Sequence, residues 1–300
     1  MPSSHATPLI GIDLGGTKIE IIALAPSGET LHRTRIPTPK AENPTHQYQA
    51  IITAIKTLIL DCENTIQHTH LPVGIGIPGA ISPKTGLIKN ANTTCLIGKD
   101  FKQDLELALQ RNVKIENDAN CFALAEAVMG AGKDHAFIFG VIMGTGCGGG
   151  FVQNKKLRVG PNLISGEWGH SILHTNGHTC YCQKQGCVET YISGGGLLKI
   201  LKDHDIHLSV EAFFQKKDKN NIESRIYQNF MNDFAQAMGN IINSIDPDII
   251  ILGGGLSNVD SLYTVGINAI NQYIFSETLK TPIVRNQLGD SAGVFGAALL

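Results

Sequence analysis

Two segments with the pattern strand, glycine turn, strand limit the fold of this chain more than any other feature. The first, Leu9–Leu24, reads LIGIDLGGTKIEIIAL: an apolar run reaches Asp13, Gly15 and Gly16 form a turn, and β-branched residues resume at Thr17. This return to a strand pattern predicts a β-hairpin. A dinucleotide-binding loop would instead open a helix after its glycines, so that interpretation is excluded.

The second segment repeats this layout in the other half of the chain. Phe137–Met143 is an apolar run, a glycine-rich turn follows from Gly144 to Gly150, and a strand pattern resumes at Phe151. Such turns let backbone N–H groups approach a phosphate. Either turn alone is also compatible with an ordinary tight hairpin. The repetition, however, predicts two duplicated domains that face each other across a nucleotide.

Composition restricts the class of protein. With 300 residues, of which 42% are hydrophobic, the chain can bury a large core, and its length predicts two domains. A net charge of −2 argues against a nucleic-acid partner or an anionic membrane surface, and no apolar run is long enough to span a bilayer. Seven cysteines, an odd and unevenly spaced set, indicate a reducing cytosol rather than a disulfide framework. We therefore expect a cytoplasmic, globular protein.

The rest of the chain alternates between helix and strand patterns. Apolar residues at helical spacing predict the helices, and short β-branched runs predict the strands. The polar, lysine-rich residues 204–221 are expected to form a solvated loop and a helix start. Helices are predicted at Pro44–Leu60, Phe101–Leu109, Ala119–Val128, Tyr227–Ile245 and Ser291–Leu300, and strands at Thr30–Ile36, Val73–Ile77, Val113–Ile115, Asp248–Leu252 and Ile283–Asn286.

Polar or glycine residues follow two of these predicted strands. Asn117 and Asp118 stand at a strand's carboxyl end, where open α/β sheets hold ligands, but the same pair would also cap the following helix. A third glycine cluster, Gly253–Gly255, would let the backbone approach a flat ligand such as adenine, with Gly254 and Gly255 as the candidate contacts, or would let a helix pack closely on a strand. The residues alone leave both alternatives open in each case.

A cysteine-rich stretch, GEWGHSILHTNGHTCYCQKQGCVE, predicts a metal site. It places three cysteines in a C-x-C-x4-C row, with three histidines just upstream. Thiolates with a nearby imidazole are what tetrahedral zinc requires, and four protein ligands would close the site to water. The alternative is a set of reduced, part-buried cysteines. The candidate ligands are Cys180, Cys182 and Cys187 with one of His170, His174 and His178.

Five motifs together resemble one family. GIDLGGTK, NDAN, IMGTGCGGG, GEWGH with CYCQKQGC, and DPDIIILGGG are similar, in this order and over Ile10–Leu299, to the ROK sugar kinases. The resemblance implies an α/β, actin/hexokinase-like (ribonuclease H-like) fold, in which two duplicated domains flank a central cleft. It implies a small N-terminal α/β domain of residues 1–117 with 283–300, and a large α/β domain of residues 118–282 that carries the zinc loop.

The resemblance also assigns roles to residues. Asp118 would be the catalytic base that accepts the proton of the sugar's 6-hydroxyl, and His170 would complete a structural Zn²⁺ site with Cys180, Cys182 and Cys187. ATP would be the phosphoryl donor, with Mg²⁺ spreading the charge of its phosphates. The implied sugar-binding residues are Gly79, Asn92, Asn117, Asp118, Glu167 and His170. The implied nucleotide-binding residues are Asp13, Gly15, Gly16, Thr17, Lys18, Gly144, Thr145, Gly146, Gly148, Gly254 and Gly255.

Within the family, the GEWGH–CYC block looks most like bacterial fructokinases that also accept mannose, so the implied reaction is phosphorylation of fructose at its 6-hydroxyl. N-acetylglucosamine kinases and glucokinases of the same family are the alternative. A sugar-sensing regulator is the non-enzyme alternative, although about eight residues precede the first strand, too few for a DNA-binding module. The implied assembly is a homodimer. Two residues depart from the family pattern: Gln183, where glycine is usual, and Phe295, where arginine is usual.

Overall fold

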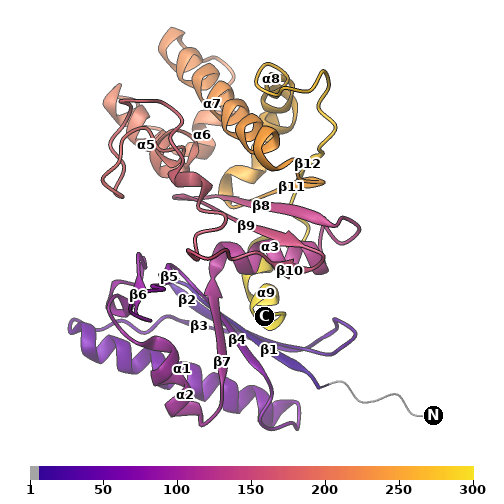
Figure 1. Ribbon diagram of the computed structural model, residues 1–300. Helices are drawn as coiled ribbons and strands as arrows, with labels where there is room; N and C mark the ends of the chain where they lie inside the picture. Colours follow the sequence, from indigo (N-terminus) through magenta and orange to yellow (C-terminus); the bar gives the residue numbers. More distant parts are fainter. Residues whose placement is uncertain (1–6) are drawn as a thin grey trace. The chain divides into compact units, whose positions relative to one another are not determined.

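The computed structural model describes residues 7–300 and divides them into two compact units (Figure 1). Unit 1 contains residues 7–125, 161–163 and 291–300, and unit 2 contains residues 126–160 and 164–290. One boundary falls inside helix α3 (Asp118–Val128), so this helix continues from unit 1 into unit 2. None of the helices in residues 7–300 combines the length and the apolar character needed to cross a membrane.

A mixed five-stranded sheet forms the centre of unit 1, in the order β3-β2-β1-β4-β7. The first three strands are antiparallel, with Asp13 opposite Glu20 in the first hairpin, and β4 and β7 are added in parallel. The predicted hairpin is therefore confirmed. The strands are β1 (Leu9–Leu14), β2 (Lys18–Leu24), β3 (Thr30–Pro37), β4 (Val73–Ile77) and β7 (Val113–Asn117), beside a small hairpin of β5 (Ala80–Ile81) and β6 (Ile88–Lys89).

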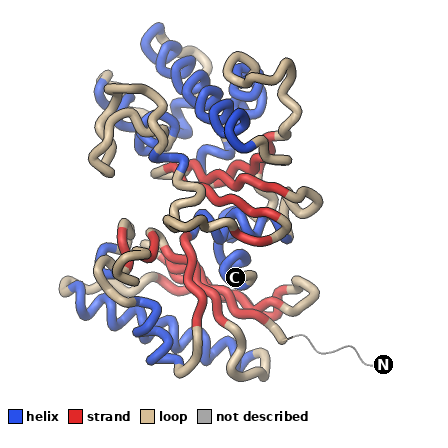
Figure 2. Tube along the Cα trace, viewed as in Figure 1, coloured by secondary structure: helices blue, strands red, loops and turns tan. Residues whose placement is uncertain are grey.

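Helices pack on both faces of the unit 1 sheet (Figure 2). On one face, Ile10 and Ile12 of β1 share a core with Ile51 of α1. On the other face α9 packs against β1 so closely that a Cβ on Gly11 would lie 2.2 Å from the backbone oxygen of Val294. Successive strand residues point to opposite faces, which is why one strand serves both layers. The helices are α1 (Pro44–Thr65), α2 (Phe101–Leu109) and α9 (Ala292–Ala298).

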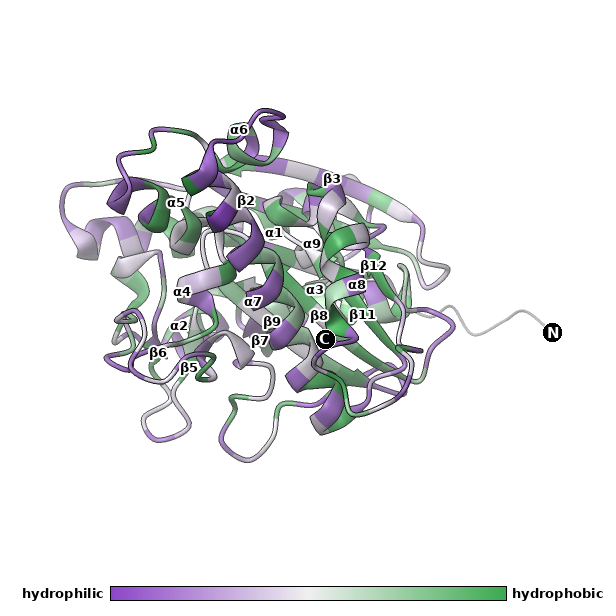
Figure 3. Cartoon of the chain, turned by 90° about the horizontal axis from the view of Figure 1, so that it is seen from above, coloured by the Kyte–Doolittle hydropathy of each residue, from purple (hydrophilic) through white to green (hydrophobic). Residues whose placement is uncertain are grey.

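Unit 2 repeats the sheet layout of unit 1. Its strand order is β10-β9-β8-β11-β12, again three antiparallel strands followed by two parallel ones. The duplication predicted from the two glycine turns is thus present in the sheets. Figure 3 shows β8 and β11 coloured mainly as hydrophobic, as expected for strands covered by helices. The strands are β8 (Phe137–Met143), β9 (Cys147–Gln153), β10 (Lys156–Leu157), β11 (Ile249–Gly253) and β12 (Ile283–Arg285).

The helical part of unit 2 departs from the sequence prediction in several places, and the helices Glu189–Ile192, Gly194–Asp203 and Ile267–Ile270 are not among those predicted. The long helix begins at Asn221 rather than Tyr227, because Asn220 and Glu223 form a capping box at its start. The segment expected to be a solvated loop contains a helix whose Phe213 is fully buried. The helices are α4 (Glu189–Ile192), α5 (Gly194–Asp203), α6 (Val210–Gln215), α7 (Asn221–Ile245) and α8 (Ile267–Ile270).

Candidate active site and metal-binding loop

The first glycine turn is held rigidly by its neighbours in unit 1. The N–H of Gly15 donates to the Lys18 carbonyl at 2.9 Å, and the Thr38 hydroxyl donates to the Gly15 carbonyl at 2.7 Å. The Thr17 carbonyl accepts from the Thr38 N–H, and the Lys40 ammonium donates to the Gly16 carbonyl at 2.8 Å. Because the Gly15 N–H is already used, phosphate contacts from this turn would have to come from other groups.

Charged side chains line the two strands that the turn connects. The Lys18 ammonium lies 3.9 Å from the buried carboxylate of Glu20. The pKa of Asp13 is raised from 3.8 to about 6: burial is the largest cause, the charges of Asp118 and Glu20 act in the same direction, and those of Lys18 and Arg35 oppose them. Asp13 and Asp118 are therefore close enough to interact. A buried carboxylate under this repulsion is a good ligand for a divalent cation, which would remove the repulsion.

Asn117 and Asp118 stand between the end of β7 and the start of α3. The side-chain oxygens of both residues accept from the N–H of Ala119 at 2.8 Å, so the predicted helix cap is present. The Asn117 amide also donates to the Gly79 carbonyl at 2.9 Å, which brings two predicted sugar-binding residues together. The side chain of Asp118 is exposed. Capping and catalysis are compatible, because a carboxylate has more acceptor positions than this one contact uses.

Thr93 was missed by the sequence analysis. It follows Asn92, which is exposed and is one of the predicted sugar-binding residues. The Thr93 side chain is 4% exposed, and its hydroxyl has no hydrogen-bond partner among the described residues. The hydroxyl lies 3.9 Å from where a Cβ on Gly16 would stand, next to the first glycine turn. An unpaired buried hydroxyl is costly, which suggests a water or ligand partner.

The second glycine turn is held by the first residues of α5. The Gly144 and Thr145 carbonyls accept from the N–H groups of Gly194 and Gly195 at 2.7 and 3.0 Å. The Gly146 carbonyl accepts from the Gly144 N–H at 2.9 Å. Hydrogen bonds from α5 therefore fix the carbonyls of this turn, and with them the spacing of its N–H groups.

Glu189 is a further residue that the sequence analysis missed. Its carboxylate accepts from the N–H of Cys147 at 2.9 Å, and a Cβ on Gly146 would lie 2.4 Å from the same carboxylate. Cys147 and Glu189 are 42 positions apart in the sequence, so no local pattern connects them. Glu189 thus joins the metal-binding loop (Gly166–Glu189) to the second glycine turn.

Trp168 makes a second connection between these segments. Its indole N–H donates to the Gly148 carbonyl at 2.8 Å, and its ring meets Phe139 edge to face. A Cβ on Gly149 would stand 2.8 Å from the indole ring, so glycine is required there. Trp168 is only 4% exposed and is therefore a core tryptophan. It fixes the turn that carries Glu167, whose side chain is exposed, and His170 against β9.

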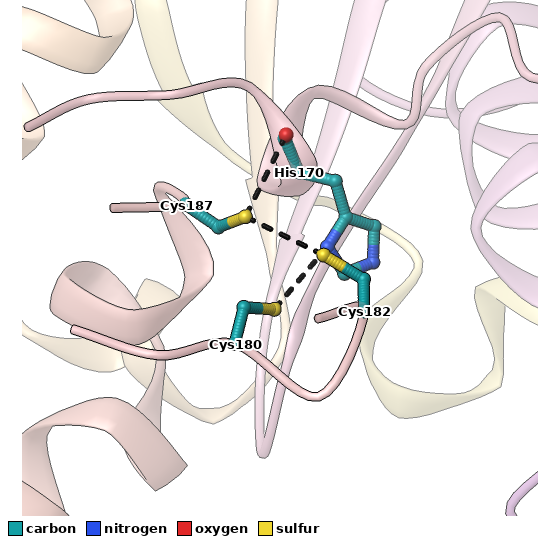
Figure 4. Close-up of side chains that lie close together, drawn as sticks. All are labelled: His170, Cys180, Cys182 and Cys187. Carbon is teal, nitrogen blue, oxygen red and sulfur yellow. Dashed lines mark hydrogen bonds between the residues drawn. The ribbon is translucent and has the colours of Figure 1, made fainter. Parts of the chain in front are cut away.

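Four side chains of the metal-binding loop (Gly166–Glu189) converge on one point (Figure 4). The ligand atoms of His170, Cys180, Cys182 and Cys187 all lie within 4.8 Å of one another. His170 Nδ1 lies 3.6 Å from Cys180 Sγ, and Cys182 Sγ lies 3.6 Å from Cys187 Sγ. Tetrahedral zinc with bonds of about 2.0–2.3 Å would place neighbouring ligands about 3.5–3.8 Å apart. The cluster therefore fits zinc.

The other two histidines of the loop have different partners. His174 Nε2 lies 2.7 Å from a carboxylate oxygen of Asp233 on α7, and the His178 ring packs on Tyr191. This resolves the choice among the three histidines that the sequence left open, in favour of His170. The pKa of the Cys187 thiol is raised to about 12, first by burial and then by the neighbouring Cys182 and Cys180, so a thiolate there needs a cation.

Gln183 and Phe295, the two departures from the family pattern, both have a place in the structure. Gln183 adopts a φ of 70°, the left-handed region that glycine favours, and its N–H donates to the Cys180 carbonyl at 3.0 Å. The loop therefore keeps the conformation of a glycine at a cost of roughly 1–2 kcal/mol. Phe295 packs under Arg33, whose guanidinium carbon lies 5.9 Å from the ring centroid.

The structure bears on both interpretations of the third glycine cluster, close packing against a neighbouring element and contact with a flat ligand. A Cβ on Gly254 would lie 2.5 Å from the Met143 carbonyl oxygen, so close packing against β8 requires this glycine. Around Gly255, no heavy atom from the described parts of the chain that are distant in sequence lies within 4 Å of the place where a Cβ would stand, so space remains beside it. Nucleotide binding by this cluster stays a prediction.

A cavity of about 440 Å³ also lies in unit 2, between the metal-binding loop and helices α5 and α7. Its polar lining includes the His174–Asp233 pair, His204 and Arg225. None of the predicted sugar-binding or nucleotide-binding residues lines it. The cavity is therefore separate from the candidate active site.

The candidate site thus consists of two groups, each within one unit. Unit 1 holds the first glycine turn with Asp13, Asn117 and Asp118. Unit 2 holds the second glycine turn, which Trp168 and Glu189 connect to the metal-binding loop. Each group combines a glycine turn, whose backbone N–H groups could approach a phosphate, with polar side chains that could bind a polar ligand.

Comparisons with known proteins agree with this duplicated fold. The model of the ROK family matches residues 9–300, and the chain belongs to this family. The N-acetyl-D-glucosamine kinase of Histophilus somni (strain 129Pt) is 35% identical to it, over 97% of each chain.

Two solved structures are similar over almost the whole chain. The ROK hexokinase from Thermus thermophilus has a TM-score of 0.86 at 26% identity and covers 97% of each chain. A ROK family glucokinase from Streptomyces griseus, solved with glucose and AMPPNP, has a TM-score of 0.74 at 25% identity, over 97% of this chain and 98% of that one. The predicted actin/hexokinase-like fold is confirmed by these matches.

Proposed function

We propose that this protein is an ATP-dependent hexose kinase that phosphorylates the 6-hydroxyl of N-acetyl-D-glucosamine. The observation that carries the choice of sugar is the 35% identity, over 97% of both chains, to the N-acetyl-D-glucosamine kinase of Histophilus somni. The two glycine turns and the exposed Asp118 support the kinase reaction. This choice replaces fructose, the substrate expected from the motifs, because the comparisons favour the alternative.

In the proposed reaction, the oxygen of the sugar's 6-hydroxyl attacks the γ-phosphorus of ATP. Its proton passes to the carboxylate of Asp118, the bond to the β,γ-bridging oxygen breaks, and ADP leaves with the electron pair. Phosphoryl transfer depends mainly on positioning and electrostatics, so the cap that fixes Asp118 at α3 serves the reaction directly. Bound Mg²⁺, for which Asp13 is the candidate ligand, would spread the negative charge of the phosphates.

The remaining predicted residues would hold the two substrates. Asn117, already oriented by its bond to Gly79, and Asn92 would contact sugar hydroxyls from unit 1, and Glu167 and His170 would do so from unit 2. The nucleotide phosphates would be bound by the backbone of the two glycine turns, with Thr17 and Lys18 as side-chain donors. A site whose polar groups hydrogen-bond a sugar hydroxyl selects strongly against sugars without that hydroxyl, because the polar groups would then be left unpaired.

The metal-binding loop would hold zinc through His170, Cys180, Cys182 and Cys187. With four protein ligands the site would be closed, and the metal would brace the loop rather than take part in the reaction. Because His170 would serve both zinc and sugar, loss of the metal would disturb sugar binding.

Fructose is the second candidate substrate. It is supported by the resemblance of the GEWGH–CYCQKQGC block to fructokinases, with mannose as an additional substrate. A homodimer remains the proposed assembly.

A turnover panel separates these candidates. Release of ADP would be measured with ATP and N-acetyl-D-glucosamine, fructose, mannose or glucose, and kcat/KM compared between the sugars. We expect the highest value for N-acetyl-D-glucosamine. A higher value for fructose would reverse the choice of sugar, and no turnover of any hexose, with zinc present, would contradict the kinase proposal.

A further inference from the structure

Tyr181 stands in the metal-binding loop between two cysteines of the cluster, and the proposed function gives it no role. Its side chain is 68% exposed. Its hydroxyl lies 3.0 Å from Nε2 of His170, and the two rings meet edge to face with centroids 5.2 Å apart. The ring is thus fixed in one orientation while its face is open to solvent.

The cluster geometry decides which of the two groups donates. His170 faces Cys180 with Nδ1, so this is the nitrogen that a metal would take. A neutral imidazole bound through Nδ1 carries its proton on Nε2, and Nε2 then donates to the Tyr181 oxygen. The phenol's own proton is left to donate to another acceptor. With both ring nitrogens used, His170 would act on the sugar through the Tyr181 hydroxyl, in place of the direct contact proposed above.

The surroundings of this hydroxyl are those of the proposed sugar site. The carboxylates of Glu167 and Glu189 lie close enough to act on it electrostatically. Glu167 is a predicted sugar-binding residue, and Glu189 holds the second glycine turn. Tyr181, His170 and these carboxylates form one polar group within unit 2, beside an exposed aromatic face.

We propose that Tyr181 is a specificity-determining residue of the sugar site: its hydroxyl, oriented by His170, donates a hydrogen bond to an oxygen of the hexose. This inference rests on the proposed function, since it requires that the polar group around His170 binds sugar. The Tyr181–His170 pair then orients the sugar without touching the reacting phosphate.

The test compares Tyr181→Phe with Tyr191→Phe. Tyr191 is a matched control because its hydroxyl also bonds the metal-binding loop, accepting from the His178 N–H at 2.9 Å, but does not contact His170. For each protein the sugar Kd is measured by calorimetry without ATP, together with KM for sugar and ATP, kcat, and zinc content. The sugar used is the one, N-acetyl-D-glucosamine or fructose, that the unaltered protein turns over or binds better.

We expect Tyr181→Phe to raise the sugar Kd and KM roughly 3- to 10-fold, the effect of one lost hydrogen bond. The KM for ATP and the zinc content should stay unchanged, and Tyr191→Phe should leave the sugar Kd as it was. An unchanged or lower sugar Kd in Tyr181→Phe overturns the inference, as does the same effect in Tyr191→Phe or a loss of zinc.

The two proposals fail in different ways. If the unaltered protein binds sugar but does not phosphorylate it, the proposed function fails while the effect of Tyr181→Phe on Kd still supports the role of Tyr181. If turnover is normal and Tyr181→Phe behaves as the unaltered protein, only the role of Tyr181 is lost. A protein that binds neither sugar contradicts both.

Discussion

Asp13 and Asp118 are carboxylates of unit 1 whose charges act on one another. Burial is the largest cause of the raised pKa of Asp13, and the charge of Asp118 is the next. In the proposed reaction one would hold Mg²⁺ and the other would take the proton. Their proximity is tolerable in the folded chain only at a cost in stability, which function would explain.

Asp13→Asn should therefore stabilise the protein. A carboxyl whose pKa rises from 3.8 to about 6 on folding binds its proton more tightly in the folded chain, so its contribution is most favourable below pH 4. As the pH rises from about 4 to about 6, the carboxyl ionises more readily in the unfolded chain than in the folded one. The free energy of unfolding therefore falls, by up to about 3 kcal/mol. Melting curves without nucleotide or Mg²⁺ should show Asp13→Asn increasingly more stable than the unaltered protein between pH 4 and pH 7. The exposed Asp61→Asn is the control, and a gain that does not depend on pH would argue against this account.

Asp118→Asn should separate catalysis from folding. Asparagine caps a helix as well as aspartate does, so the melting temperature should change little. Loss of the general base should lower kcat roughly 10²- to 10⁴-fold. Turnover close to that of the unaltered protein would leave Asp118 with its capping role alone.

The metal-binding loop shows how a short irregular segment is ordered by a few strong contacts. Its 24-residue sequence motif contains little regular structure besides the short turn at Trp168–His170, and Trp168, Glu189 and the His174–Asp233 pair fix it to the rest of unit 2. Zinc would add four bonds to this set.

Cys182→Ser should remove the zinc and weaken sugar binding. Metal analysis should find about one zinc per chain in the unaltered protein and little in the variant. Its melting temperature should fall, and the sugar KM should rise more than the KM for ATP, because His170 loses its orientation. His178→Ala is the matched control, a neighbouring histidine outside the cluster, and should retain zinc. Full sugar affinity in a zinc-free preparation would be incompatible with this role for the metal.

Gln183→Gly should stabilise the same loop. Gln183 holds a φ of 70°, which costs a residue with a Cβ roughly 1–2 kcal/mol and glycine almost nothing. The greater flexibility of glycine in the unfolded chain offsets part of this gain. We expect a melting temperature that is equal or higher, with zinc retained. A clear loss of stability would show that the glutamine side chain makes a contribution of its own.

Local patterns predicted the longer strands and the two hairpins with glycine turns, because a period of two and a glycine turn are visible within a few residues. The two-residue strands β5, β6 and β10 were not predicted, because they are too short to show a period. They predicted the helix Phe101–Leu109 with the bounds that the structure has. The capping box at Asn220 was a readable signal that the analysis overlooked. Glu189 and Thr93 could not have been found in this way, because their importance depends on contacts between segments distant in the sequence.

The two sheets with the same strand order are the main property of the whole chain. Each sheet begins with a hairpin whose glycine turn is fixed by its own unit, through Thr38 and Lys40 in unit 1 and through α5 and Glu189 in unit 2. Duplication thus gives each unit a glycine turn of the same layout, and these are the two turns proposed to bind the phosphates of ATP. The side chains that differ between the units, Asp118 in one and the metal-binding loop in the other, divide the proposed reaction between base and sugar recognition.

Identification of the reaction product tests the central claim most directly. The protein, zinc-loaded and supplied with ATP, Mg²⁺ and N-acetyl-D-glucosamine or fructose, would be followed by phosphorus NMR, with ADP measured in the same sample. We predict one hexose phosphate for each ADP, with the phosphate on the 6-oxygen, and no product from Asp118→Asn on the same time scale. ADP release without a sugar phosphate, or a phosphate on another oxygen, would contradict the proposed function.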